Sequence, residues 1–439
     1  TFVDAIPNQE PSKIKQAFEK EKDSSTFDLK AFVDRHFTLP SAQMEEIPEA
    51  HSIEEYIEKM WPILRKEMKK NSEWDTLIPL PNPHIVPGGR FRECFYWDSY
   101  FTALGLPITY IKEMVQNFAH LIDLFGFIPN GNRIYFTSRS QPPYFSFLLK
   151  LLYDKGEKDF ALTFTPHLEK EYLYWTSHQT PLSSYFDALS TPRPEAYKRE
   201  LELAKTSDDP QFFSHLRAAC ASGWDFSSRW LADGKTFATI QALDLLPVDL
   251  NSLLLHFEET LYLFSSNPTY QLAADQRKRA LQTLFWQSDF FFDIDMHTKK
   301  PTPSKTLAGA TPLFTRAATQ AQADAVAKIL EKNFLLPGGF VTSLKESGHQ
   351  WDMPNGWAPL QWITIQGLLN YGHKELALEG ARRFLALIKK IYQETGTLHE
   401  KYNVRDCSLS VARGEYHPQQ GFGWTNGVAS ALTHLLQKH

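Results

Sequence analysis

Helical periodicity is the feature that most constrains how this chain of 439 residues folds. Apolar residues recur at intervals of three and four, while the apolar–polar alternation that marks strands is scarce. In residues 376–391, one face carries Ala377, Ala381, Phe384, Leu385, Ile388 and Ile391. The pattern predicts helices over residues 52–64, 97–106, 111–125, 144–153, 159–178, 249–264, 273–286, 317–330, 357–369 and 376–391.

Stretches rich in glycine, proline and charged residues lie between the predicted helices and are spread along the whole chain. Ser52, followed three residues later by Glu55, predicts a capping box at the start of the helix over residues 52–64. In a ring of helices, loops that are far apart in sequence meet at one end of the ring. Such a fold would bring the polar side chains of these loops into one site. Periodicity alone predicts a mostly α-helical protein, and no internal repeat is strong enough to define its helix pairs.

The composition excludes several classes of partner. Lysine and arginine number 46 against 51 aspartate and glutamate, a net charge of −5, and no basic patch dominates, so we expect no nucleic acid partner. No apolar run approaches the roughly 18 residues that span a bilayer, so we expect no membrane insertion. The 3 scattered cysteines indicate neither a disulfide framework nor a zinc site. Aromatic residues reach 14%, which fits stacking on carbohydrate as well as a large core.

Residues 87–98 concentrate the groups that a sugar site needs. The run Pro-Gly-Gly opens a tight turn, since glycine adopts the required backbone angles without a Cβ clash. Arg90, Phe91, Trp97 and Asp98 then mix ionic and aromatic side chains. Flat rings cover the face of a pyranose, while carboxylates and guanidinium groups hold its hydroxyls. The alternative is a surface loop with a buried aromatic end.

Two carboxylates are candidates for acid–base chemistry. Asp225 lies between a tryptophan and a phenylalanine, where loss of solvation favours the protonated acid. The alternative is a carboxylate that caps residues 226–230. Glu400 precedes Lys401 and Tyr402, which favour the ionised base, and the alternative is an ordinary surface glutamate. Hydrolysis of a glycosidic bond uses such a pair on opposite sides of the anomeric carbon.

Two longer motifs carry a resemblance to a known family. Residues 87–100 fit Pro-Gly-Gly-Arg-Phe-x-Glu-x-x-x-Trp-Asp-x-Tyr, and residues 350–359 read Gln-Trp-Asp-Met-Pro-Asn-Gly-Trp-Ala-Pro. On these motifs the chain resembles the trehalase family of glycoside hydrolases, from about residue 1 to residue 427. The resemblance implies an all-α fold, a single (α/α)6 barrel over residues 51–439 with its active site at one mouth. Residues 1–50 are then expected to wrap the outside as an N-terminal segment.

The resemblance also assigns an activity and roles. It implies an α,α-trehalase that hydrolyses trehalose to two glucose molecules by inverting single displacement, without a metal or other cofactor. Asp225 is then the general acid and Glu400 the general base. Motif by motif, it implies substrate contacts from Arg90, Phe91, Trp97, Asp98, Asn132, Arg139, Ser140, Gln141, Arg193, Pro194, Glu195, Gly223 and Glu415. Trp351 and Trp357 are expected to wall the pocket, whereas Asp352 fits helix-start packing equally well.

The segment after Glu400 departs from the family pattern. Where the family has a run of glycines before a Gly-Glu-Tyr sequence, this chain retains only Gly414. Glycine loses the most conformational entropy on ordering, and Leu409 and Val411 are able to pack. Residues 405–413 are therefore predicted to be partly ordered without ligand.

Two alternatives to a trehalase follow from the same residues. One is another (α/α)6 glycosidase that acts on a different disaccharide. The other is a sugar-binding protein without catalytic activity, which the loss of either carboxylate would have favoured. We expect a soluble monomer. The chain begins at Thr1 without a methionine, so removal of a leader stays open, and with it a periplasmic or a cytoplasmic location.

Overall fold

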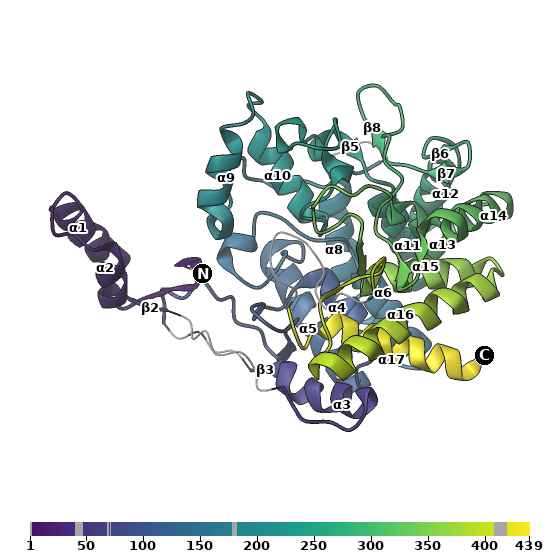
Figure 1. The fold of residues 1–439 in the computed structure, drawn as a ribbon, viewed down its shortest axis with the longest axis horizontal. Coiled ribbons are helices and arrows are strands. Elements are labelled where there is room, and N and C mark those ends of the chain that lie inside the picture. Colours follow the sequence, from purple (N-terminus) through teal and green to yellow (C-terminus); the bar gives the residue numbers. More distant parts are fainter. Residues whose placement is uncertain (1, 40–46, 68–69, 71, 178–181, 408–418) are drawn as a thin grey trace.

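The computed structural model describes residues 2–39, 47–67, 70, 72–177, 182–407 and 419–439. Helices joined by long loops dominate these residues, which confirms the prediction of a mostly α-helical protein (Figure 1). The helices are α1 (Pro11–Glu21), α2 (Leu29–His36), α3 (Ile53–Leu64), α4 (Tyr96–Ala103), α5 (Ile108–Phe125), α6 (Phe145–Asp154), α7 (Lys158–Leu162), α8 (Thr165–Thr176), α9 (Tyr197–Ala204), α10 (Phe212–Ala221), α11 (Val248–Ser265), α12 (Pro268–Thr283), α13 (Thr311–Phe314), α14 (Gln320–Ile329), α15 (Ala358–Asn370), α16 (Lys374–Thr395) and α17 (Gly423–Lys438).

An inner ring of helices forms the centre of the described structure. Helix α4 packs on α6, α6 on α11, α11 on α13, α13 on α15 and α15 on α17, and α17 returns to α4. Each helix of the ring therefore has a neighbour on both sides. All 8 residues of α4 are buried, because this helix is enclosed by the ring and by the layer outside it.

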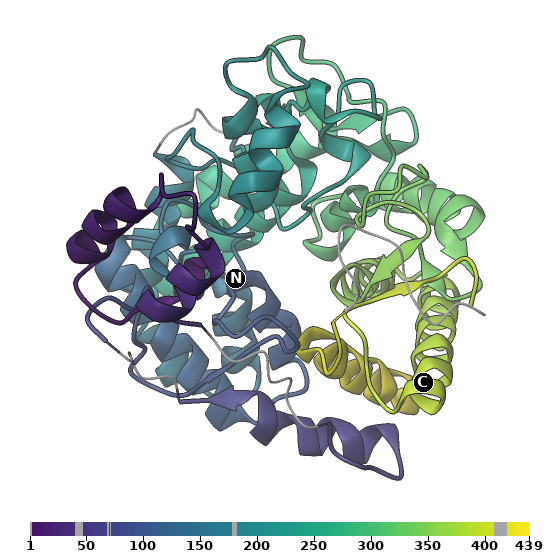
Figure 2. The same ribbon diagram turned by 60° about the vertical axis from the view of Figure 1, so that its left-hand side comes forward.

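A second layer of helices covers the ring from outside. Along the chain the outer helices α3, α5, α8, α12, α14 and α16 alternate with the inner ones. The outer helix α16 buries the face predicted from the sequence, including Ala377, Phe384 and Ile388. Figure 2 shows the chain passing once around, so that α17 in yellow lies beside α3 in dark blue, on which it packs. This is the (α/α)6 toroid that the resemblance implied.

Short antiparallel strand pairs tie the loops together. The strands are β1 (Ile6–Pro7), β2 (Phe37–Thr38), β3 (Arg65–Lys66), β4 (His84–Ile85), β5 (Leu245–Leu246), β6 (Trp286–Gln287), β7 (Phe290–Phe291), β8 (Ile294–Asp295), β9 (Leu335–Leu336), β10 (Gly339–Phe340), β11 (Asn355–Trp357) and β12 (Lys401–Asn403). In the pair β11–β12, Trp357 lies opposite Lys401. This pairing holds the second motif beside the segment that carries Glu400.

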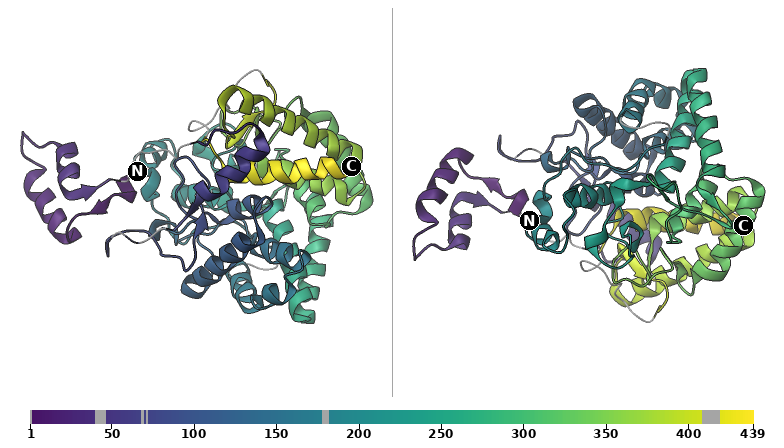
Figure 3. Two further views of the ribbon diagram at one scale, coloured as in Figure 1. Left: turned by 90° about the horizontal axis from the view of Figure 1, so that it is seen from below. Right: turned by 90° about the horizontal axis from the view of Figure 1, so that it is seen from above.

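The N-terminal residues form a unit of their own. Helices α1 and α2 pack around Phe18, Phe27 and Phe32, whose rings lie 5.6–5.8 Å apart. Figures 1 and 3 show this helix pair projecting from the body of the molecule, so these two helices do not lie along its surface. The 3-10 turn η1 (Phe2–Asp4) returns to the body and packs on the turn η3 (Pro194–Ala196). A domain boundary near residue 50 stays a prediction.

Two predictions about individual helices need correction, one on the limits of a helix and one on its capping. The helix predicted over residues 159–178 is two helices, α7 and α8, because the chain breaks at Thr163 and α8 restarts with Pro166 in its first turn. At the start of α3, Ser52 accepts from the N–H of Glu55 at 3.1 Å, but the Glu55 carboxylate accepts from the N–H of His51, so the predicted capping box is not closed. No helix in the described ranges is both long and apolar enough to cross a membrane.

Candidate active site

A cavity of about 420 Å³ lies where the N-terminal ends of several inner helices meet. Trp97 reaches it from α4, Gln141 from the loop before α6, Trp357 from the start of α15 and Trp424 from α17. Helix N-termini carry partial positive charge, which favours carboxylates beside them. Among the predicted site residues, the cavity is lined by Arg90, Phe91, Trp97, Asp98, Arg139, Gln141, Arg193, Glu195, Gly223, Asp225 and Glu400.

The loop after α10 presents Asp225 to the cavity. Gly223 precedes it with φ = +77°, and a Cβ at that position would lie 2.8 Å from the Trp97 ring, so the turn requires glycine. Gln350 donates from Nε2 to the backbone oxygen of Asp225 at 2.5 Å. The peptide bond between Asp225 and Phe226 is cis. The N-cap of the following turn η4 (Ser228–Trp230) is Ser227. The alternative role of Asp225, a cap for residues 226–230, is therefore filled by Ser227.

Asp352 anchors this loop from behind. Its carboxylate is fully buried and accepts from Ser227 Oγ at 2.8 Å, the Ser228 N–H at 2.7 Å and Ser343 Oγ at 2.7 Å. These donors tie the second motif to the residues that follow Asp225. Asp352 is not part of the cavity lining, so of its two predicted roles the packing role describes it.

Glu400 directly precedes β12, and its side chain is only 2% exposed, which excludes an ordinary surface glutamate. The ammonium of Lys401 is 3.7 Å from Glu400 Oε2 and donates to Gln350 Oε1 at 2.7 Å. Gln350 in turn holds the backbone of Asp225. The two candidate catalytic segments are thus joined through one buried lysine and one amide side chain.

Tryptophan side chains make one wall of the cavity. Trp351 and Trp357 stack with their ring centres 3.8 Å apart, and Trp97 lies 5.6 Å from Trp351. The indole N–H of Trp424 donates to the backbone oxygen of Glu400 at 2.9 Å, which fixes both the ring and the Glu400 backbone. Such a rigid aromatic wall provides the flat surface that a pyranose ring covers.

Asp98 is a third carboxyl group in the cavity. Burial, together with the charges of Glu400 and Asp225, raises the pKa of Asp98 to about 8. A negative charge on either neighbouring carboxyl group makes ionisation of Asp98 unfavourable. At neutral pH Asp98 therefore carries a proton and is able to donate a hydrogen bond.

The three predicted arginines line the cavity, and carboxylates hold two of them, Arg139 and Arg193. Arg139 Nη2 donates to Glu195 Oε1 at 2.7 Å. Arg193 donates to Glu200 from Nε at 2.5 Å and from its backbone N–H at 2.7 Å. Glu195 is half-buried, and although burial raises its pKa, Arg139 and Arg193 hold that pKa below the ordinary value. Because it accepts both of these hydrogen bonds, the Glu200 carboxylate on α9 fixes the direction in which the Arg193 side chain points.

Three predicted contact residues that the structure describes, Asn132, Ser140 and Pro194, do not line the cavity. The amide of Asn132 is buried, accepts from the Cys94 N–H at 2.8 Å and donates to the Ile78 oxygen at 3.1 Å. Asn130, two residues earlier, lines the cavity instead. The Ser140 hydroxyl donates to a backbone oxygen at 2.6 Å, and Pro194 begins η3. Glu415 lies outside the described residues, and so do residues 408–413, most of the segment that was predicted to be partly ordered.

Comparison with known proteins places the chain in a family. A sequence model of the family described as Trehalase matches residues 1–437. The chain belongs to the trehalase family. The periplasmic trehalase of Citrobacter koseri is 40% identical over 471 aligned residues, which cover 99% of this chain and 83% of that protein. The periplasmic trehalase of Salmonella schwarzengrund is also 40% identical, with the same coverage.

Solved structures share the toroid. Neutral trehalase Nth1 from Saccharomyces cerevisiae matches with a TM-score of 0.69 at 24% identity, over 90% of this chain and 80% of that one. The GH63 mannosylglycerate hydrolase from Thermus thermophilus, in complex with Tris, matches with a TM-score of 0.60 at 17% identity, over 87% of this chain and 100% of that one. At these identities the likeness shows the fold alone.

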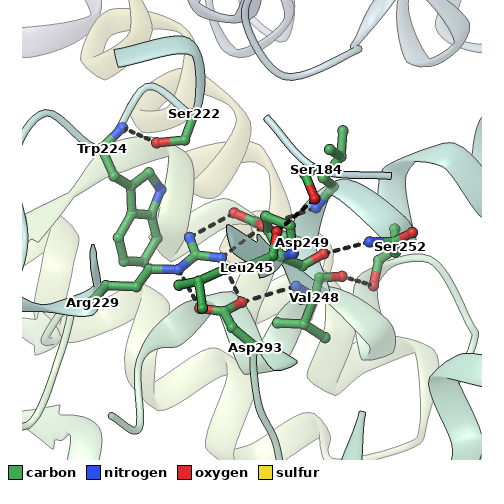
Figure 4. A network of polar contacts seen from close by, with 12 residues as sticks. Ser184, Ser222, Trp224, Arg229, Leu245, Val248, Asp249, Ser252 and Asp293 are labelled. Carbon is green, nitrogen blue, oxygen red and sulfur yellow. Dashed lines mark hydrogen bonds and ion pairs between the residues drawn. The ribbon is translucent and has the colours of Figure 1, made fainter. Parts of the chain in front are cut away.

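A buried ionic cluster supports the loop that carries Asp225 in this member of the trehalase family. Figure 4 shows Arg229 between Asp249 and Asp293, to which it donates two pairs of hydrogen bonds of 2.7–2.8 Å. Its guanidinium lies 4.7 Å from the Trp224 ring centre. Trp224 precedes Asp225, and none of the residues of the cluster lines the cavity, so the cluster supports the loop from outside the cavity. Burial of these charges has a desolvation cost, and it would destabilise the fold if a charge were unpaired. The bidentate hydrogen bonds offset that cost.

Sequence reasoning missed several residues of this trehalase-family cavity. They fall into two groups: neighbours of predicted residues within the same motifs, and residues that tertiary structure alone brings in. The first group is Glu93, Phe95, Asn130, Tyr135, Phe136, Ala196, Cys220, Phe226 and Gln350. The second group is Asp4, Arg199, Phe422 and Trp424. A search of the residues within three positions of each predicted residue would have found the first group.

Proposed function

We propose that this chain hydrolyses α,α-trehalose to two glucose molecules by inverting single displacement, with Asp225 as general acid and Glu400 as general base. The observation that carries the proposal is one cavity that holds both carboxyl groups among arginines and tryptophans. The trehalase family and the relatives named periplasmic trehalase support the substrate. They also make the protein a glycoside hydrolase.

Hydrolysis of the glycosidic bond requires two proton transfers, one to the leaving oxygen and one from the attacking water. Asp225 gives its proton to the oxygen that bridges the two glucose units, while Glu400 takes a proton from the water that attacks the anomeric carbon. One C–O bond forms as the other breaks, and the displaced glucose leaves as a neutral alcohol. Lys401, at 3.7 Å, favours the ionised form of Glu400 that this role requires.

Recognition of the sugar rests on the other lining groups. The guanidinium groups of Arg90, Arg139 and Arg193 are able to bridge neighbouring hydroxyls. Asp98 and Glu195 complement them as a donor and an acceptor. No step needs a metal ion. Among the described residues no group of histidine, cysteine and carboxylate side chains has an arrangement that could hold one.

Kinetics of matched variants tests the proposal. Asp225→Asn and Glu400→Gln should each lower kcat for trehalose by about 10²–10⁴-fold with little change in KM, because each loses one proton transfer. The control is Asp208→Asn, which alters an exposed carboxylate in the loop after α9 and should leave both constants unchanged. Activity within tenfold of wild type in either variant would remove that residue from the mechanism.

Comparison of substrates separates the alternatives. The wild-type protein should release glucose from trehalose and much more slowly, if at all, from maltose and sucrose. A faster reaction with either of those sugars would favour an (α/α)6 glycosidase for another disaccharide. Binding of trehalose without glucose release would favour a catalytically silent sugar-binding protein. A monomer stays our expectation, and light scattering of the purified protein tests it.

A further inference from the structure

The N-terminal segment reaches the cavity. Asp4 lines the same cavity as Asp225 and Glu400, although the next lining residue along the chain is Arg90. The Asp4 carboxylate accepts a hydrogen bond from the Tyr135 hydroxyl at 2.6 Å, and Tyr135 lines the cavity as well. Both side chains are half-buried. The segment that sequence analysis assigned to the outside of the fold thus contributes a carboxylate to the site.

The charges around Tyr135 and Asp4 keep the Tyr135 hydroxyl protonated. Burial and the carboxylates of Glu93 and Asp4 raise the pKa of Tyr135 above its ordinary value. The Tyr135 hydroxyl therefore stays protonated and donates to Asp4 throughout the range in which the fold is stable. A short hydrogen bond from a neutral donor to a carboxylate fixes the direction of the carboxylate.

The position of Asp4 along the cavity follows from its neighbours. The charge of Asp225 acts on Arg193, and Arg193 Nη1 lies 3.6 Å from Glu195 Oε1. Glu195 belongs to η3, on which η1 packs. These contacts connect Asp225, through Arg193 and Glu195, to the turn that carries Asp4. Because the acid and the base stand on opposite sides of the anomeric carbon, the groups beyond the acid lie beside the departing sugar.

We propose that Asp4 is a specificity-determining residue that binds a hydroxyl of the departing glucose, and that Tyr135 positions it. The inference rests on the proposed hydrolysis of trehalose. A carboxylate has about four acceptor sites, so it is able to accept from a sugar hydroxyl while it also accepts from Tyr135. The departing glucose of a disaccharide offers several such hydroxyls, whereas a leaving group of one atom offers none.

A pair of substrates tests this assignment. Trehalose fills both sugar positions, while α-glucosyl fluoride fills only the position of the anomeric carbon, and its fluoride leaves without a second ring. Asp4→Ala should raise KM for trehalose about tenfold, the usual effect of losing a hydrogen bond to a charged group. Its kcat/KM for α-glucosyl fluoride should stay within about twofold of wild type. Tyr135→Phe should raise KM for trehalose about threefold, because Asp4 keeps its charge but loses its orientation.

Thr38→Val provides the matched control. The Thr38 hydroxyl donates to Asn8 at 2.6 Å within the same N-terminal segment, and Thr38 is not part of the cavity lining. This variant should leave both substrates unchanged. The assignment is overturned if Asp4→Ala leaves KM for trehalose unchanged, if it slows both substrates alike, or if Thr38→Val reproduces its effect. A wild-type protein that hydrolyses the fluoride but not trehalose would instead overturn the proposed function.

Discussion

Replacing Asp98 by asparagine should stabilise the protein, and the gain should be larger at pH 8 than at pH 5. In the folded protein, burial and the charges of Glu400 and Asp225 raise the pKa of Asp98 from 3.8 to about 8. In the unfolded chain the carboxyl group is solvated and has its ordinary pKa. Between these two values the folded state binds a proton that the unfolded state has released.

The sign and the size of the effect follow from this linkage. Because the folded pKa is the higher one, Asp98 costs no stability below pH 4, and the cost grows as the pH rises towards 8. Each pH unit in that window is worth about 1.4 kcal/mol, so the cost increases by up to about 4 kcal/mol between pH 5 and pH 8. Asparagine does not titrate and avoids the cost. For a chain of 439 residues, about 1 kcal/mol corresponds to about 1 °C in Tm, so the extra gain is about 4 °C.

The assay is calorimetry at pH 5 and pH 8 at one scan rate, with kinetics on the same samples. Asp98→Asn should raise Tm more at pH 8, and it should lose less activity than Asp98→Ala, because the amide still donates a hydrogen bond. Glu171→Gln is the matched control. Glu171 on α8 is not part of the cavity lining, and burial raises its pKa to about 8 as well. It should show the same dependence of Tm on pH with unchanged kinetics.

Equal gains in Tm at pH 5 and pH 8 for Asp98→Asn would refute the reasoning, because they would mean that Asp98 is ionised in the folded protein at neutral pH. A larger gain at pH 5 would contradict it more strongly. If Glu171→Gln shows the pH dependence and Asp98→Asn does not, the neighbouring carboxyl groups do not raise the pKa of Asp98, and the proposal that Glu400 is an ionised base needs revision.

Three further predictions concern catalysis. Early NMR spectra of trehalose hydrolysis should show one β-glucose for each α-glucose, and spectra with α-glucose alone would contradict inversion. Arg193→Lys keeps the charge but loses the planar fork that Glu200 holds, so kcat/KM should fall about 10–100-fold; an unchanged value would make Arg193 structural. Lys401→Met removes the cation 3.7 Å from Glu400, so kcat should fall about tenfold, most at acidic pH where the base needs that charge to stay ionised. A uniform fall across pH would point to a lost scaffold instead.

Local sequence made Asp225 and Glu400 candidates, through the two aromatic neighbours of Asp225 and through Lys401 directly after Glu400. Their roles as acid and base came from the family resemblance and stay predictions, while the structure shows that both line one cavity. The helical toroid was implied by the family resemblance, while periodicity alone indicated only helices. Amphipathic helices are read from single segments, but the closure of a ring depends on contacts between segments that are distant in sequence.

Tertiary contacts set the limits of the prediction. The loop before η2 (Ile134–Phe136) contains two asparagines, and backbone geometry turns Asn132 inward to the oxygen of Ile78 while Asn130 faces the cavity. Nothing in the order of residues distinguishes the two. Likewise, the bond from Lys401 to Gln350 joins two motifs, and the approach of Asp4 depends on how the N-terminal segment packs.

The helix that closes the ring has a consequence for synthesis of the protein. Helix α17 is made after every other helix of the ring, and it packs on both α3 and α4 while supplying Trp424 to the cavity. Until it leaves the ribosome, the apolar side of α4 that it covers has no partner, and a ring with a gap exposes surface that promotes aggregation. A chain that stops before residue 423 should therefore be inactive and fold poorly, although it contains both long motifs and both carboxylates of the proposed mechanism.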